Sequence, residues 1–465
     1  MNRKPLNLAS APRRALLKFF AGTGLLAAVE RNLAIAQTAP DYKALVCINM
    51  AGGNDGDNTL IRYDAAGYQN YAAIRTPASL LNIPRDQLQP IQPASVPTPF
   101  GFHPACAPLK TLFDQKKLAV VANVGMLVRP STKAGLETQG SPRPANLFSH
   151  SDQELALQSG DATGFTRVGW GGRIADRFEA LNPGTLFPVL VSTNGMKTFT
   201  SGRTSIPLTV PAGSSSFTMN GSGNPPNFNA FQFDVLRDAA LRQILALNQT
   251  NTYALAAQLL SEEGLSAASV VNPILRNTGS AVSPFFSGLN SNIANQLKTI
   301  ALLIESRAQI QLKRQLFFAQ QFGYDTHGFQ LGDQRKLLGD FSLALKAFQD
   351  AITALGLAGN VTCFTLSDFG RAFKPAGSGG SDHGWGNCAF VMGGAVRGGD
   401  FYGTLPVLAL NGPDDLGANG RWIPTTSLEQ YGATLTRWLG IAEGDLRYVF
   451  PNIGAFANSN LGFMA

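Results

Sequence analysis

Cysteine, histidine and charged residues are all scarce in this chain of 465 residues. It contains four Cys and four His, and charged residues make up 14% of the chain, below the quarter that is usual for soluble domains. The cysteines form neither a disulfide-rich scaffold nor a CxxC metal motif. They are Cys47, Cys106, Cys363 and Cys388. We interpret them as buried free thiols, and one disulfide stays open if the compartment is oxidising.

Basic runs are also missing beyond the N-terminus, although the formal net charge is +7. A nucleic-acid partner therefore has little support. Glycine and proline are plentiful, with 49 and 27 residues, which indicates a globular protein rich in loops. The length is sufficient to bury a large core, so one big α/β domain with insertions is expected.

The N-terminal segment has the layout of an export signal. The run RRALLK at 13–18 precedes an apolar Gly/Ala-rich stretch at 19–29, and AIA at 34–36 provides a small-residue cleavage pattern. The apolar stretch is too short to be a stable membrane span. A paired arginine in this setting resembles a twin-arginine signal. We expect residues 1–36 to be removed and 37–465 to be a single periplasmic or secreted domain. The alternative is a basic amphipathic helix that stays attached.

Apolar runs and helical spacing predict an α/β fold with a mainly parallel central sheet and helices on both faces. The predicted strands are 44–50, 118–124, 187–192, 361–366 and 388–392. The predicted helices are 107–114, about 150–158, 170–181, about 231–248, 251–263, 285–318, 337–355 and 427–439. The segment at about 195–315 is interpreted as a middle insertion over the sheet, which could shape a pocket or bind a protein partner.

Reactive side chains gather where predicted strands end. Asp368 and Arg371 directly follow the strand at 361–366, and Asp382 and His383 come after a Gly/Ser-rich loop. Ligand chemistry in open α/β sheets lies beyond the carboxyl ends of strands. The first strand likewise runs into Gly52-Gly53-Asn54-Asp55, which either holds a carboxylate at the sheet edge or is an ordinary turn.

Three of the four histidines lie beside hydroxyl or carboxylate residues, in Ser149-His150-Ser151, Asp325-Thr326-His327 and Asp382-His383. His103 we interpret as structural. Asp and His without Cys are typical of a hydrolytic Zn, Mn or Mg site rather than a structural zinc. Ser149 lies at a predicted helix start, where its hydroxyl could attack phosphorus or sulfur or could simply cap the helix.

Several segments, in order along the chain, resemble the exported bacterial family called domain of unknown function 1501. They are LVCINMAGGNDGDNT, FHPACAPLKTLFDQKKLAVVANVG, NLFSHSDQE, FGYDTHGF, CFTLSDFGRAF, GSDHGWGNCAFVMGG and VRGGDFYG. That family is placed by similarity in the alkaline phosphatase and sulfatase superfamily. The resemblance implies an alkaline-phosphatase-like core and an active site that binds divalent metal.

The same resemblance implies roles for individual residues. The implied metal ligands are Asp55, Asp325, His327, Asp368 and His383, and the implied nucleophile is Ser149, or less readily Ser151.

The chain departs from the superfamily pattern at two places. Phe369 stands where the superfamily usually has a histidine, and Asp325 and His327 are two residues apart rather than four. One metal site could therefore be incomplete, lost, or filled by Asp382. Arg371 either binds a substrate anion or forms an ion pair with Asp368.

These observations predict an exported metal-dependent hydrolase acting on small anionic phosphate or sulfate esters. Phosphatase-like chemistry is favoured over sulfatase-like chemistry, because the nearest candidate for a sulfatase motif, CAPLK at 106–110, ends in Lys and precedes the second strand. The alternative is a non-catalytic binding or assembly protein on a degenerate hydrolase scaffold.

Overall fold

The computed structural model describes residues 42–465 except for 139, 165, 180–186 and 214–231. The predicted signal peptide lies outside the described residues. None of the described helices is long and apolar enough to cross a membrane.

A nine-stranded sheet forms the centre of the protein, in the order β13-β5-β12-β9-β1-β8-β6-β7 with β14 beside β5. Its strands are β1 (Lys43–Ala51), β5 (Leu118–Gly125), β6 (Leu190–Ser192), β7 (Leu208–Thr209), β8 (Arg314–Phe322), β9 (Val361–Ser367), β12 (Asn387–Gly393), β13 (Phe401–Tyr402) and β14 (Thr426–Ser427). Only β12 runs antiparallel to its neighbours β5 and β9. The predicted α/β class with a mainly parallel sheet is confirmed.

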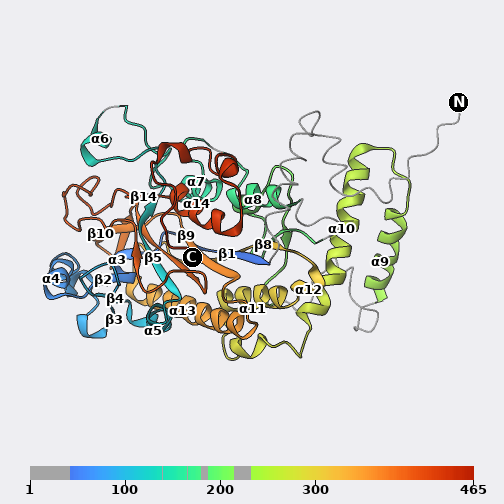
Figure 1. The fold of residues 1–465 in the computed structure, drawn as a ribbon, viewed down its shortest axis with the longest axis horizontal. Coiled ribbons are helices and arrows are strands. Elements are labelled where there is room, and N and C mark those ends of the chain that lie inside the picture. The colour runs from blue at the N-terminus through green and yellow to red at the C-terminus, as the bar shows by residue number, and fades with distance from the viewer. Residues whose placement is uncertain (1–41, 139, 165, 180–186, 214–231) are drawn as a thin grey trace.

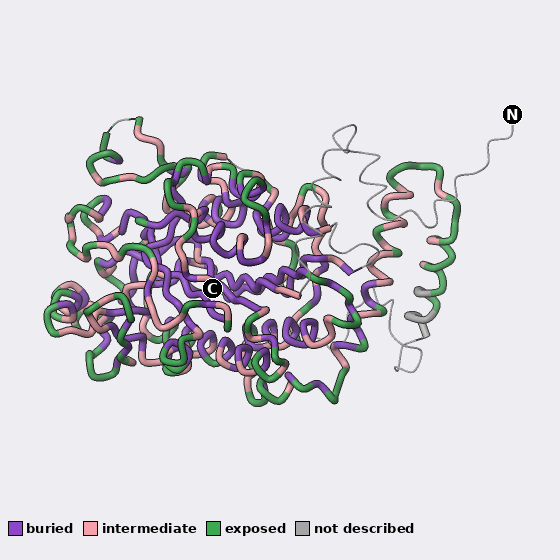
Figure 2. The backbone as a smooth tube through the Cα atoms, in the orientation of Figure 1, coloured by how far each residue is buried: buried purple, intermediate pink, exposed green. Residues whose placement is uncertain are grey.

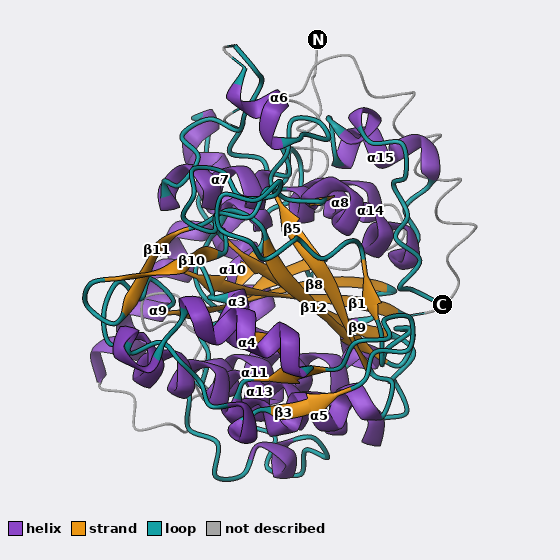
Figure 3. Cartoon of the chain, turned by 90° about the vertical axis from the view of Figure 1, so that its left-hand side faces the viewer, coloured by secondary structure: helices purple, strands orange, loops and turns teal. Residues whose placement is uncertain are grey.

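Helices cover both faces of this sheet, as predicted (Figure 1, Figure 3). One face carries α5 (Ala107–Asp114), α11 (Asn292–Glu305) and α13 (Gln330–Ala354). The other carries α7 (His150–Ser159), α8 (Trp170–Phe178), α14 (Leu428–Leu439) and α15 (Leu446–Val449). Because both faces are covered, the central strands are continuous apolar runs; every residue of β5 is buried. Figure 2 shows this buried layer through the middle of the molecule.

Smaller elements surround the strand ends. They are α3 (Gly56–Thr59), β2 (Leu60–Arg62), α4 (Ala65–Ile74), β3 (Gln89–Ile91), β4 (Phe100–Phe102), α6 (Lys133–Glu137), α12 (Arg307–Ile310), β10 (Arg371–Ala376) and β11 (Gly380–His383). Short 3₁₀ turns occur at Pro77–Ser79, Arg85–Gln87, Pro104–Cys106, Thr198–Thr200, Ser283–Phe286, Glu443–Asp445 and Ile453–Ala455. All four cysteines are free thiols.

The middle of the chain differs in part from the prediction. The helices α9 (Gln232–Leu245) and α10 (Thr252–Leu275) extend away from the sheet (Figure 1). The predicted helix at 285–318 was wrong at its end, because β8 begins at Arg314. Helical spacing continues from α11 into this stretch, but pairing with β1 and β6 decides the outcome. That the segment at about 195–315 is an insertion stays a prediction.

Candidate metal centre

Two strands that flank β1 lead to a group of side chains at one edge of the sheet. β1 lies between β9 and β8 and is parallel to both. Beyond β8 the chain supplies Asp325 and His327, and beyond β9 it supplies Asp368. His150 is the first residue of α7 and His383 the last of β11. Residues far apart in sequence therefore meet at the carboxyl ends of the strands, where α/β folds place ligand chemistry.

His150, Asp325 and His383 converge on one point. The Nε2 atom of His150 lies 3.1 Å from Nε2 of His383 and 3.1 Å from Oδ1 of Asp325. His383 Nε2 lies 3.5 Å from the same oxygen. Ligands bound to zinc at about 2.0–2.1 Å on a tetrahedron are roughly 3.3–3.4 Å apart. The three groups could therefore hold a metal ion.

His327 adjoins this group on its open side. Its Nε2 lies 2.8 Å from Nε2 of His383 and 3.0 Å from Oδ1 of Asp325. Its side chain is 47% exposed, and the exposed carboxylate of Asp382 lies 3.5 Å from its Nδ1. We call His150, Asp325, His327 and His383 the His/Asp cluster.

Hydrogen bonds at the Nδ1 atoms of His383 and His150 orient both rings so that their Nε2 atoms face the cluster. His383 Nδ1 lies 2.6 Å from the carbonyl oxygen of Phe148, and His150 Nδ1 lies 2.8 Å from Oδ2 of Asp368. A carbonyl can only accept, so Nδ1 of His383 donates and Nε2 of the neutral ring presents a lone pair. Metal-binding histidines are held in this way by their outer nitrogen.

Electrostatics favour a cation at the cluster. The hydrogen bond to Asp368 raises the pKa of His150, while burial lowers the pKa of His383. Burial alone would raise the pKa of Asp325, but the hydrogen bond to Arg371 together with the charges of His150, Arg371 and His327 outweighs burial, so this pKa is lowered. An ionised carboxylate and the Nε2 lone pair of His383 therefore converge, and they repel one another unless a proton on His150 or a metal ion places positive charge between them.

Arg371 holds Asp325 in place. Its Nη1 lies 2.9 Å from Oδ1 of Asp325 and 3.1 Å from the carbonyl of Gly52, and it also donates to the carbonyl of Ser381. The sequence left open an anion-binding role or an ion pair with Asp368. The structure pairs Arg371 with Asp325 instead.

Two glycines make room for this arrangement. Gly52, with φ of 111°, donates its N–H to Oδ2 of Asp368 at 3.0 Å, and an added Cβ would lie 2.4 Å from the backbone nitrogen of Asp325. A Cβ on Gly380 would lie 2.1 Å from the backbone of His327. Any side chain at either position would displace a cluster residue. Asp368 itself is buried and keeps Oδ1 without a partner within the described residues, so an acceptor remains beside the cluster.

Phe369, which stands where the resemblance led us to expect a histidine, packs beside the cluster. Its ring centroid lies 4.6 Å from that of His150 and 4.9 Å from that of His383. It therefore packs against two imidazoles of the cluster and contributes no ligand.

His150 belongs to the cluster, whereas the neighbouring Ser149 does not. Ser149 is the N-cap residue of α7, and its Oγ donates to Oδ2 of Asp152 at 2.6 Å and lies 3.2 Å from Oγ of Ser151. His150, which sequence reasoning did not select, reaches the cluster. Its signal was the position beside Ser149 at a predicted helix start.

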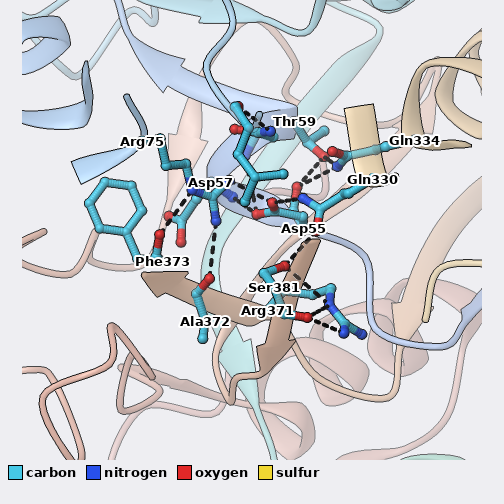
Figure 4. Close-up of polar contacts among 12 residues, drawn as sticks. Asp55, Asp57, Thr59, Arg75, Gln330, Gln334, Arg371, Ala372, Phe373 and Ser381 are labelled. Carbon is cyan, nitrogen blue, oxygen red and sulfur yellow. Dashed lines mark hydrogen bonds and ion pairs between the residues drawn. The ribbon is translucent and has the colours of Figure 1, made fainter. Parts of the chain in front are cut away.

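Asp55 lies outside the cluster, in contrast to the role that the resemblance implied, and Figure 4 shows the contacts that it makes instead. Its Oδ2 forms a fully buried ion pair with Nη1 of Arg75 at 2.5 Å and accepts from Gln330. Its Oδ1 accepts from the backbone N–H groups of Asp57 and Asn58 and so caps α3. The glycine-flanked acid thus starts a helix and neutralises an arginine.

His103 is also apart from the cluster. It is buried, its Nδ1 accepts the backbone N–H of Ala105, and burial lowers its pKa to about 4. This environment fits the structural role we expected.

Residues 42–437 match a family model described as a protein of unknown function (DUF1501). The chain belongs to this family. No curated protein sequence matches it.

Solved structures that resemble the chain include sulfatases. The PsFucS1 sulfatase from Pseudoalteromonas sp. is 9% identical with a TM-score of 0.36, and the match covers 90% of this chain and 71% of that one. The C-terminal periplasmic domain of EcEptC from Escherichia coli, in complex with Zn, is 11% identical with a TM-score of 0.30, covering 87% and 84%. Similarity at this level says nothing of activity.

Proposed function

We propose that the protein is an exported, metal-dependent hydrolase of phosphate or sulfate esters, with its metal held by His150, Asp325 and His383. One observation carries the proposal. Two imidazole nitrogens and an ionised carboxylate oxygen converge within 3.1–3.5 Å of one another at the carboxyl ends of parallel strands.

The two imidazoles favour a divalent ion such as Zn over Mg or Mn, which prefer oxygen ligands. When bound, such an ion would polarise an ester oxygen and lower the pKa of water. Arg371 keeps Asp325 ionised and oriented. His327, on the exposed side, has a nitrogen facing the cluster and Asp382 beside its other nitrogen, so it is placed to move a proton to or from substrate.

Arg421 is our candidate for binding the substrate's anionic group, since Arg371 is already engaged. Its Nε donates to the carbonyl of His383 at 3.0 Å, and its guanidinium lies 4.4 Å over the ring of Phe148. No partner for its Nη groups is found in the described part of the chain. Arginine binds phosphate and sulfate oxygens through such paired donors.

The direct test is hydrolysis of aryl phosphate, aryl sulfate and aryl phosphodiester by purified protein supplied with Zn or Mn. We expect turnover of one ester class that is lost in D325N and kept in D350N, a surface control that carries the same change of charge in a pair with Lys346. Inactivity on all three classes with metal bound, or equal activity of D325N and wild type, would contradict the proposal.

Ser149 remains our candidate nucleophile because it precedes His150 at the N-terminus of a ten-residue helix, where backbone N–H groups favour an anion. S149A should abolish turnover, and S151A should retain most of it. Full activity of S149A would leave water as the nucleophile.

A non-catalytic role on the same scaffold is a second candidate. The observation that favours it is the hydroxyl of Ser149, which donates to Asp152 and lies beside the hydroxyl of Ser151. A protein that binds metal stoichiometrically but hydrolyses none of the esters would match this candidate.

Export by the twin-arginine route is part of the proposal and rests on residues 13–36. Replacing Arg13 and Arg14 together by lysine should leave the full-length precursor inside the cell. Export of that variant at the wild-type rate would contradict the route.

A further inference from the structure

A cavity of about 370 Å³ is lined by none of the four residues of the His/Asp cluster, although Arg371, which pairs with Asp325, is part of its lining. Apolar side chains form much of its wall. They include Leu60, Phe100, Leu405, Val407 and Leu408. Cavities that hold small organic ligands are of this size and are mainly apolar, with a few polar groups that set orientation.

Asp57 supplies the charged group of this cavity. Its two oxygens accept from Nε1 of Trp422 at 2.9 and 3.2 Å. The nearby Arg75 is engaged elsewhere, because its Nη1 pairs with Asp55 and its other nitrogens donate to the carbonyls of Phe373 and Ala372 (Figure 4). Two carboxylates therefore lie near one buried guanidinium, so Asp57 has no cation of its own when it is ionised.

Asn123 also lines the cavity, but it offers no acceptor to a ligand there. Its Nδ2 donates to the carbonyl of Ile423, and its Oδ1, which has no partner within the described residues, is covered beside Gly386. The carboxylate of Asp57 is therefore the acceptor on which binding in this cavity would depend. The cations nearby are already paired, since Arg62 contacts Asp64 and Arg371 contacts Asp325. The lining therefore suits a ligand that donates hydrogen bonds and carries positive charge.

We propose that this cavity binds a small primary amine, with its ammonium group at Asp57 and its apolar body against the leucine and phenylalanine side chains. An ammonium group offers three donors and one positive charge, which match the unpaired carboxylate. A neutral or anionic ligand of the same shape would leave that charge uncompensated. This site is separate from the proposed hydrolase centre and does not depend on it.

The charge of Asp57 makes the proposal sensitive to pH. Burial raises its pKa to about 7; Arg75 opposes this and Asp55 adds to it, while the Trp422 hydrogen bond lowers it. Cys388 also faces it, and burial keeps that thiol neutral with a pKa of about 12. An ammonium ion selects the ionised carboxylate, so binding should release a proton near neutral pH and weaken about tenfold per pH unit below that value.

The test is calorimetric titration of the purified protein with benzylamine and with its neutral analogue benzyl alcohol. At about pH 8 we expect one benzylamine per chain, and benzyl alcohol at least about tenfold weaker. D57N should weaken benzylamine at least about tenfold and abolish the pH dependence, while D350N should bind as wild type does. Each titration is repeated after a chelator, because an amine could also ligate metal at the His/Asp cluster.

Three outcomes would overturn the proposal. They are equal affinity for the amine and the alcohol, loss of amine binding on chelation, and no binding at millimolar benzylamine. If D57N fails to fold, two other measurements still test the proposal. They are the affinity of L408W, in which the larger side chain fills the apolar end of the cavity, and the pH profile of the wild type. An unchanged affinity in L408W or a flat profile between about pH 5 and 8 would contradict binding at this site.

Discussion

The Nε2 atoms of His327 and His383, 56 residues apart in the chain, lie 2.8 Å from each other. The outer nitrogen of His383 donates to a backbone carbonyl, so its inner nitrogen has no proton in the neutral ring. Asp325 places an ionised oxygen beside both rings. Only a shared proton or a metal ion makes such an arrangement favourable, and the exposure of His327 leaves a side from which substrate can approach.

Replacing His327 by alanine separates the roles within the cluster. His150, Asp325 and His383 remain in H327A, so metal affinity should stay within about tenfold of the wild-type value. Turnover should fall by about 10²–10⁴-fold, because the group that carries the proton is gone. Metal titration and kcat on the same preparation measure the two effects. Loss of metal as complete as in H383A would show that His327 is an essential ligand.

Asp368 is expected to act through His150. D368N replaces the carboxylate beside Nδ1 of His150 by a neutral amide. The metal affinity of the cluster should therefore drop by about 10–100-fold. The comparison is D350N, whose partly exposed Asp pairs with Lys346 and should leave affinity unchanged. Competition with a chromogenic chelator gives both constants. Equal affinities in the two variants would mean that the contact with His150 does not tune the site.

The buried Arg75–Asp55 pair should behave as a structural element. R75M leaves the Asp55 carboxylate buried without its partner and should reduce the free energy of unfolding by about 3–5 kcal/mol. The double variant R75M/D55N should recover part of that loss and keep its metal, as judged by urea unfolding and metal analysis. The partly exposed Lys346–Asp350 pair on the surface of α13 is the comparison, and K346A should cost no more than about 0.5 kcal/mol. Metal loss in the double variant would restore Asp55 as a ligand.

Asp57 should make stability depend on pH. Its folded-state pKa of about 7 lies above the ordinary value of 3.8. The folded state therefore resists ionisation, and this contribution to stability is complete below about pH 4 and is lost as pH rises to 7. D57N should match wild type at about pH 4 and be more stable at about pH 8, by at most about 4 kcal/mol. Unfolding midpoints at the two pH values test this. A uniform loss of stability at both would show that the carboxylate is favourable in its ionised form.

The sequence was sufficient for the features that depend on local pattern. The apolar runs of β1, β5, β9 and β12 and the periodicity of α13 and α14 predicted their elements. The strand-end position drew attention to Asp368, and the pairing of histidine with a nearby carboxylate drew attention to Asp325, His327 and His383. A strand buried on both faces and a helix buried on one face each leave a hydrophobic pattern within their own segment, so these features can be predicted from that segment alone.

Features that depend on distant contacts were not predictable. His150 meets Asp368 across 218 positions, and the short run before it looks like any helix cap. β8 follows a helix whose spacing continues into it, and only its pairing with β1 marks it as a strand. Asp55 was interpreted as a ligand because nothing near it in sequence shows that Arg75 approaches from α4.

Metal analysis of purified protein tests the central claim most directly, with the four histidines as internal comparison. Wild type and H103Q, whose changed residue lies outside the cluster, should each retain about one divalent ion per chain after dialysis, and H150A and H383A should retain almost none. A wild type that stays free of metal after incubation with Zn and Mn, or an H383A that keeps as much metal as H103Q, would contradict the account.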